Sequence, residues 1–403
     1  MNSRERVLAA INHKQPDLTP IDFGAMRSTG IMAIAYNKLK TYLHMTEGET
    51  FVYDVMQQLA EPEPWILDLF QADVEQLHRY RPAFGASLRA KRPGTLPDGS
   101  PAVFPADFLP VVKDGVECVI VDGNVVAQRP PTALYFEGDF HPLENARAEK
   151  DLDAVKYTSL DDEEFDWLKK RAAELRASTD RAVTGHFGGN FFEAGHGLFG
   201  YGEFMMRMAA EPHLVRALFD RLLDGYLADL KRYIEAVGDN IDIIICGDDL
   251  GTQGGLAVSP SMYRDLIKPC EKELFGYIKD HTDWKIFLHT CGSIYPVIRD
   301  LIEVGVDILN PVQTAAKDMD PARLKREFGA DVTFWGGGVE TQSTLAFGRP
   351  DDVRREVRER MRVFSPGGGF VFNQVHNIQA NVPPENIVAL YDAAIEFRKP
   401  SSL

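Results

Sequence analysis

The segment His289-Thr290-Cys291-Gly292 carries an imidazole and a thiol two residues apart. It directly follows the apolar run 286–288, so it stands at the end of an expected strand. In an extended chain the side chains of residues i and i+2 point to the same side, so both groups can reach one ion. Imidazole nitrogen and thiolate sulfur are ligands that suit zinc. The alternative is a histidine and a cysteine that are buried and satisfied by local hydrogen bonds.

His376 supplies a second imidazole, in the segment 370–379 near the end of the chain. It follows another apolar run, so we expect it beside His289. Together with Cys291 it makes a set of three metal ligands. Three protein ligands leave one position open, which is typical of a catalytic zinc site. The alternative is a histidine that only hydrogen-bonds within its own loop.

Two adjacent carboxylates, Asp248 and Asp249, follow the apolar run 241–246. Adjacent carboxylates are costly to hold together unless one is protonated, solvated or paired. We expect one of them to act as a general acid or base, or to orient a ligand of the metal. In the alternative reading, one caps the following turn and the other faces water.

Five further residues lie just after expected strands, and we predict that they contact the substrate: Arg27, His186, Asn310, Glu340 and Asn373. An arginine can hold a carboxylate through two hydrogen bonds, although Arg27 could instead be a surface residue. Glu340 follows a glycine run at 336–338, which could admit a ligand or form a tight turn. Its carboxylate is also a candidate fourth metal ligand. His186 could equally be an ordinary polar loop residue.

Short apolar runs must position these residues. After residue 181, such runs alternate with helical stretches, a pattern that predicts a parallel sheet covered by helices. The runs are 182–185, 241–246, 284–288, 306–309, 332–335 and 370–372, and the helices include 201–210, 214–237, 260–279, 294–304, 321–328 and 350–363. Two more units near 20–24 and 73–78 bring the number to eight and favour a (β/α)8 TIM barrel, an α/β fold. The carboxyl ends of barrel strands meet at one mouth, where the reactive residues would gather.

The 403 residues are expected to form a single barrel domain over 1–403, because α/β barrels can be this long. A short amphipathic helix is predicted from Ser3 to Asn12. The stretch from about 86 to 150 is richer in proline and glycine and contains strand-like pieces at 118–121 and 124–127. We interpret it as an irregular β-rich insertion in the barrel.

The composition indicates which binding partners and which cellular compartment to expect. The net charge of −16 argues against nucleic acid and anionic membrane surfaces, which attract clustered lysine and arginine. The four cysteines show no closely spaced framework, so reduced thiols in a cytoplasmic protein are expected. No apolar run approaches the length of a membrane span, and the N-terminus has no apolar signal core.

Several motifs, taken together, carry a resemblance to a known family. They are Arg4-Glu-Arg-Val-Leu-Ala-Ala-Ile-Asn-His13, Pro16-Asp-Leu-Thr-Pro20, His289-Thr-Cys-Gly292, Val306-Asp-Ile-Leu-Asn-Pro311 and Val382-Pro-Pro-Glu-Asn-Ile387. Over nearly its whole length the chain resembles the uroporphyrinogen decarboxylase superfamily, closest to its methyltransferase-like branch. The resemblance implies a (β/α)8 barrel.

Two branches of the superfamily imply different chemistry. The decarboxylases use no metal and hold an acidic tetrapyrrole with arginines in a segment like Met-Arg-Gln-Ala-Gly-Arg. Here the segment 26–31 keeps Arg27 but has Ser28 and Ile31 in place of the glutamine and the second arginine, which argues against a tetrapyrrole. The other branch contains zinc-dependent methyltransferases that use an H-x-C pair and a distant cysteine. His376, nine residues before Glu385, stands where that cysteine is expected.

The leading hypothesis is therefore a zinc-dependent methyltransferase with a corrinoid on a partner protein. A methyl group would move between the corrinoid and a small donor or acceptor, for example a methyl ether that is demethylated, and zinc would lower the pKa of the accepting or leaving group. The alternative is a metal-free carboxy-lyase of the uroporphyrinogen decarboxylase type, in which an acid such as Asp248 protonates the carbon. A binding barrel without catalysis is the third reading. Two copies of the chain could also associate as a homodimer.

Overall fold

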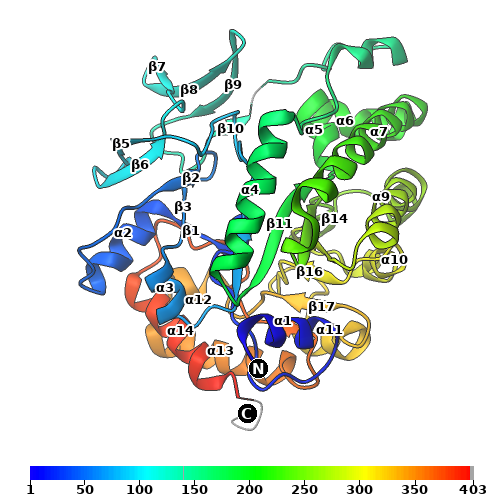
Figure 1. Cartoon of the computed structure of the whole chain (residues 1–403). Coiled ribbons are helices and arrows are strands. Elements are labelled where there is room, and N and C mark those ends of the chain that lie inside the picture. Colours follow the sequence, from blue (N-terminus) through cyan, green and yellow to red (C-terminus); the bar gives the residue numbers. More distant parts are fainter. Residues whose placement is uncertain (139, 400–403) are drawn as a thin grey trace.

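The computed structural model describes residues 1–138 and 140–399, and its centre is a curled sheet of seven parallel strands (Figure 1). The strands lie in the order β18-β17-β16-β15-β12-β11-β4. Their bounds are Val74–Leu77 (β4), Ala182–Gly188 (β11), Ile243–Gly247 (β12), Lys285–His289 (β15), Ile308–Asn310 (β16), Thr333–Trp335 (β17) and Phe370–Val371 (β18). Each apolar run predicted after residue 181 therefore contributes a strand to this one sheet.

Ile21 closes the sheet into a barrel. It forms a parallel bridge with Phe372, just after β18, and its carbonyl oxygen accepts a 2.7 Å hydrogen bond from the N–H of Asp73, just before β4. The eighth strand position is thus occupied but is reduced to one bridged residue. The chain turns at once, because Asp22 Oδ1 accepts a 2.8 Å hydrogen bond from the N–H of Ala25. The predicted (β/α)8 barrel is confirmed.

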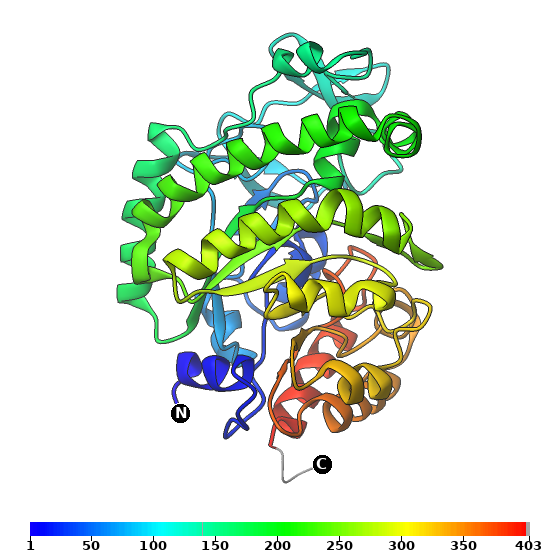
Figure 2. The same cartoon turned by 90° about the vertical axis from the view of Figure 1, so that its right-hand side faces the viewer.

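Helices cover the outside of the barrel. Figure 2 shows α7 (Pro212–Val237) and α9 (Lys268–His281) running side by side, in line with their mutual contacts. The other helices are α2 (Ala33–Tyr42), α3 (Pro64–Leu69), α4 (Asp162–Ser178), α5 (Phe192–Phe199), α6 (Tyr201–Ala210), α8 (Pro260–Met262), α10 (Ile298–Glu303), α11 (Pro321–Phe328), α12 (Thr344–Phe347), α13 (Pro350–Phe364) and α14 (Pro384–Phe397). The bounds of α6 and α11 match the predicted ranges 201–210 and 321–328.

The helix predicted at 260–279 is interrupted. A π-helical turn, Tyr263–Ile267, separates α8 from α9. Pro269 stands in the first turn of α9 and has no N–H for the helical ladder, so the turn before it widens. A hydrophobic pattern alone does not distinguish this widened turn from a continuous helix.

Strand periodicity sets which residues face the barrel interior. Side chains alternate along a strand, so Phe287 and His289 of β15 share the inward side, whereas Ile286 and Leu288 pack against the helices. The inward apolar cluster is Val7, Ile11, Ala25, Met26, Val74, Ala182, Ile243, Ile245, Phe287, Ile308, Trp335 and Val371. This packed layer fills the barrel below the level of His289.

Helix α1 (Ser3–Ile11) closes the amino-terminal end of the barrel, at the bottom of Figure 1. Its side chains Val7 and Ile11 join the interior cluster. The helix begins with a capping box, in which Asn2 accepts from the N–H of Glu5 and Glu5 accepts from the N–H of Asn2. The predicted helix from Ser3 is therefore present, and it leaves the opposite end of the barrel as the mouth.

The stretch predicted as a β-rich insertion contains β5 (Lys91–Thr95), β6 (Pro101–Pro105), β7 (Val111–Lys113), β8 (Val116–Val121), β9 (Asn124–Arg129) and β10 (Glu137–Gly138). Strands β7 to β10 form an antiparallel sheet at the top of Figure 1. Two hairpins turn on Asp114 and Asp122, each with positive φ and each followed by glycine, the sequence that tight hairpins favour.

Three smaller strands that the sequence did not predict, β1 (Ile31–Met32), β2 (Val52–Asp54) and β3 (Leu59–Ala60), form a sheet of their own. Strand β13 (Gly251–Thr252) pairs with β14 (Gly255–Leu256). Among the described residues, no helix has the length and apolar character needed to cross a membrane.

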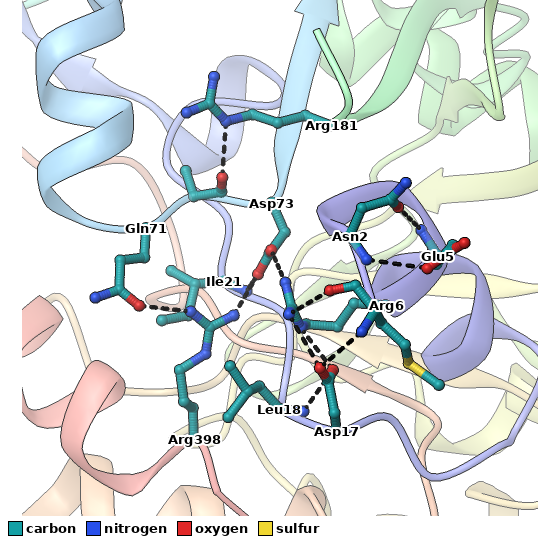
Figure 3. A network of polar contacts seen from close by, with 12 residues as sticks. Asn2, Glu5, Arg6, Asp17, Leu18, Ile21, Gln71, Asp73, Arg181 and Arg398 are labelled. Carbon is teal, nitrogen blue, oxygen red and sulfur yellow. Dashed lines mark hydrogen bonds and ion pairs between the residues drawn. The ribbon is translucent and has the colours of Figure 1, made fainter.

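A buried ionic network holds the closed end together (Figure 3). The carboxylate of Asp73 accepts from Arg6 at 2.7 Å, from Arg398 at 2.5 Å and from the N–H of Ile21 at 3.0 Å. Arg6 also pairs with the more exposed Asp17 at 2.9 Å. The network thus ties α1 and the residue after α14 to the short first strand position.

We expect Asp73→Ala to lower the free energy of unfolding by about 3–5 kcal/mol, because it leaves buried guanidinium groups without their carboxylate. Asp331→Ala is the control, since it removes a surface pair with Arg299 and should cost less than about 1 kcal/mol. Urea unfolding monitored by circular dichroism measures both changes. Equal losses in the two variants would contradict a structural role for the Asp73 network.

Candidate metal centre

The structure brings the three predicted metal ligands together at the barrel mouth. His289 ends β15, Cys291 follows it, and His376 lies in the loop after β18. One ligand atom from each residue lies within 4.8 Å of those of the other two. Within this group His289 Nε2 is 3.4 Å from Cys291 Sγ, and the two imidazole ring centres are 6.0 Å apart. Residues almost 90 positions apart thus present nitrogen and sulfur donors to one point.

Asn310 fixes the orientation of the His289 ring. Its amide nitrogen donates to the carbonyl oxygen of Trp335 at 3.0 Å, which leaves its oxygen Oδ1 as an acceptor. That oxygen accepts from Ser28 Oγ at 2.7 Å and faces His289 Nδ1 at 2.8 Å, so Nδ1 carries the proton. Nε2 is therefore unprotonated, and its lone pair is directed at Cys291 Sγ. This is the arrangement that metal-binding histidines usually have.

The His376 ring is held in its uncharged form. It is largely buried, and burial together with the nearby His289 lowers its pKa to about 4. Its loop is fixed on both sides, because the N–H of Val375 donates to Val339 and the N–H of Ile378 donates to Gly30. A neutral imidazole is the form that binds a metal ion.

Cys291 lies in surroundings that disfavour a free thiolate. Burial and the Asp249 carboxylate raise the pKa of its thiol well above the ordinary range. Its backbone N–H donates to Asp249 Oδ1 at 2.8 Å, and the N–H of Gly292 donates to Gln313 Oε1 at 2.7 Å. A cation at this point would instead favour the Cys291 thiolate over the protonated thiol, since bound metal ions strongly stabilise the deprotonated form.

The two adjacent acids Asp248 and Asp249 have different surroundings. The buried Asp248 carboxylate accepts from the N–H groups of Phe191, Phe192 and Glu193 at 2.8–3.0 Å, at the amino-terminal end of α5. Burial raises its pKa to about 7. The half-exposed Asp249 instead lies 3.6 Å from His289 Nε2. Asp249 is thus the acid that adjoins the ligand group, whereas Asp248 supports the loop beside it.

Glu193 is a third carboxyl group at the site, although it is not among the site residues predicted from the sequence. Burial raises its pKa to about 7, and the neighbouring Asp249 and Asp248 add to this shift. Its position depends on α5 beginning at Phe192 with its N–H groups bound to Asp248. The short helix was not evident from periodicity, so the proximity of Glu193 to Asp249 was not predicted.

Arg27 and His186 face the same region from other elements. Arg27 pairs with the buried Asp54 through Nε and donates through Nη2 to the carbonyl oxygen of Pro82 at 3.1 Å. Burial lowers the pKa of His186 to about 3, and the positive charge of Arg27 contributes. The mouth therefore contains a fixed positive charge and a neutral imidazole. Their predicted contact with substrate stays a prediction.

The other predicted substrate residues have different positions. Asn373 is fully buried, and its amide nitrogen donates to the carbonyl oxygen of Asp22 at 3.0 Å. Glu340 lines a separate cavity of about 420 Å³ with Glu356 and Arg360, and it is not part of the metal-ligand group found among the described residues. A larger cavity of about 940 Å³ lies on the barrel flank beside β4 and α4. None of the predicted site residues lines that larger cavity.

Comparison with known proteins agrees with this fold. A solved methyltransferase from Methanosarcina mazei superimposes with a TM-score of 0.59 at 17% identity, covering 98% of this chain and 99% of that one. The uroporphyrinogen decarboxylase of Psychromonas ingrahamii is 28% identical over 195 residues, and that of Aeromonas salmonicida is 26% identical over 195 residues. These alignments cover 47% of this chain, which spans about half the length of these curated relatives.

The family model for uroporphyrinogen decarboxylase (URO-D) matches residues 137–397. This range includes strands β11 to β18 and all three residues of the metal-ligand group. The match extends over more than half of the chain, and the barrel fold is the one expected from it. This chain belongs to the uroporphyrinogen decarboxylase family.

Proposed function

We propose that this protein is a zinc-dependent methyltransferase that moves a methyl group between a small molecule, such as a methyl ether, and a corrinoid on a partner protein. The observation that carries the proposal is the convergence of His289, Cys291 and His376 donor atoms within 4.8 Å. The Asn310 hydrogen bond leaves the His289 Nε2 lone pair free for a metal. A decarboxylase that uses no metal has no need of this arrangement.

The donor set fits zinc. Two neutral imidazoles and one thiolate are ligands that zinc accepts in tetrahedral catalytic sites, with a fourth position open to substrate. One thiolate leaves more positive charge on the centre than two would. Bound zinc would supply Lewis acidity toward the oxygen or sulfur atom that loses or gains the methyl group.

The surrounding residues would bind the substrate and handle its proton. Asp249 and Glu193 both adjoin the ligand group, so either could give a proton to a leaving oxygen or accept one from an incoming thiol. Arg27 could hold a carboxylate of the substrate at the mouth. The buried Asp248 would act through the loop that it supports.

A second candidate is a metal-free carboxy-lyase. The observation that favours it is the similarity to curated uroporphyrinogen decarboxylases over half of their length. In that function Arg27 would hold substrate carboxylates, and an acid such as Asp248 would protonate the carbon that loses carbon dioxide.

Purified protein is expected to contain about one zinc ion per chain, because the ligand group offers three donors and one open position. His289→Ala, Cys291→Ala and His376→Ala should each lose the bound metal, measured by elemental analysis. His281→Ala is the control, since this exposed residue on α9 contacts Tyr277, through its carbonyl oxygen and its ring, and lies outside the ligand group. Full zinc content in all three site variants would refute the zinc site.

Asn310→Ala should weaken zinc binding about ten- to hundredfold, because the His289 ring loses the partner that fixes its tautomer. Competition with a chromophoric chelator measures the dissociation constant. Asn240→Ala is a suitable control, since Asn240 also donates a single hydrogen bond to a backbone oxygen, that of Val237. An unchanged dissociation constant in Asn310→Ala would argue against the orienting role.

The two candidate functions predict different effects when a metal-ligating side chain is removed. If the chain is a methyltransferase, transfer of methyl from an aryl methyl ether to free cob(I)alamin should fall at least about a hundredfold in His289→Ala. Absorbance of the corrinoid follows this reaction. Release of carbon dioxide from uroporphyrinogen by metal-free protein, unchanged in His289→Ala, would instead identify a carboxy-lyase.

A further inference from the structure

A chain of hydrogen bonds connects the β-rich insertion to the loop that carries His376. Tyr135 lies just before β10, and the neighbouring N–H of Phe136 donates to the carbonyl oxygen of Met56 at 2.9 Å. The Tyr135 hydroxyl donates to Asn377 Oδ1 at 3.2 Å. The amide nitrogen of Gln379 donates both to that hydroxyl oxygen and to Asn377 Oδ1. The insertion therefore contacts the residue next to His376 through a hydrogen bond between side chains.

Asn377 stands between Tyr135 and the metal-ligand group. Its side chain is fully buried, and its polar group favours the charged form of the adjoining His376 ring. Its amide nitrogen donates to Gln57 Oε1 at 2.7 Å, which commits Oδ1 to the role of acceptor. Each imidazole of the ligand group thus adjoins an asparagine, because Asn310 bonds the His289 ring and Asn377 follows His376 directly in the chain.

We infer that Tyr135 is a positioning residue for the third metal ligand, acting through Asn377 to fix the His376 ring. The inference rests on the proposed zinc function. Tyr135 can only act as a steady donor while its phenol is protonated, and burial keeps it so by raising its pKa. Without the hydroxyl, Asn377 Oδ1 loses one donor and Gln379 loses one acceptor, so the residue next to His376 is held less firmly and the ring is freer to turn.

The arrangement gives the insertion a role in the chemistry of the mouth. The sheet β7–β10 leads directly to Tyr135, so a shift of that sheet would be transmitted to His376 by hydrogen bonds between side chains. Partners that orient a metal-bound imidazole typically change metal affinity when they are removed. Removal of the Tyr135 hydroxyl is expected to change metal affinity in the same way, but by a smaller factor, because Tyr135 contacts Asn377 and not the imidazole itself.

The test compares Tyr135→Phe with Tyr157→Phe in the full chain. Tyr157 is the matched control because its hydroxyl donates only to the carbonyl oxygen of Leu152, away from the His376 loop. We expect Tyr135→Phe to weaken zinc binding about three- to tenfold and Asn377→Ala about ten- to hundredfold, while Tyr157→Phe leaves it unchanged. Chelator competition measures the affinity, and the visible spectrum of the cobalt(II)-substituted protein reports ligand geometry. The spectrum should shift in Tyr135→Phe.

A double variant separates positioning from general stability. If Tyr135 acts through Asn377, adding Tyr135→Phe to Asn377→Ala should weaken zinc binding no further. Additive losses, or wild-type affinity and an unchanged spectrum in Tyr135→Phe, would overturn the inference while leaving the zinc site intact. Absence of zinc from the wild-type protein would overturn the proposed function together with this inference. If Asn377→Ala does not fold, the affinity and spectrum of Tyr135→Phe still decide the question.

Discussion

The hydrogen bond between His289 and Asn310 is the contact on which the candidate site depends. The two residues are register partners on the neighbouring parallel strands β15 and β16. Strand pairing therefore sets the imidazole beside the group that orients it, and strand alternation turns both toward the barrel axis. A shift of either strand by one residue would turn its member of the pair toward the outer helices. The backbone fold thus specifies the chemistry of the site directly.

Electrostatics around this pair follow from burial. The imidazoles of His376 and His186 are held neutral, the Cys291 thiol is held protonated, and Glu193 and Asp248 bind protons more readily than free carboxyls do. Arg27 is paired with Asp54. Few groups at the mouth are thus left to carry charge, although acidic residues are abundant in the chain. A dication at the ligand group would change this balance, because it stabilises the thiolate and the nearby carboxylates.

The barrel and the position of the ligand group were predictable from the sequence. Apolar runs mark the strand ends, and barrel topology then brings those ends together. The convergence of His289, Cys291 and His376 required only that reasoning. The strand predicted near 20–24 is present, but its reduction to the single residue Ile21 and the widened turn before Pro269 were not predictable, since hydrogen bonds between distant segments and a missing N–H decide them. The difference between Asp248 and Asp249 depends on a helix start at Phe192 that periodicity does not reveal. Tyr135 belongs to an irregular segment, whose contacts only the folded chain defines.

The ligand group contains a single sulfur atom, with imidazole at the position where relatives of the methyltransferase branch are expected to carry a second cysteine. A disulfide needs two thiols, so an oxidant cannot lock this centre shut by joining its own ligands. Oxidation of the ligand group would have to proceed through Cys291 alone, and burial disfavours its reactive thiolate while no metal is bound. If the proposed zinc site is present, the exchange of sulfur for nitrogen would remove one route of oxidative inactivation, independently of its effect on Lewis acidity.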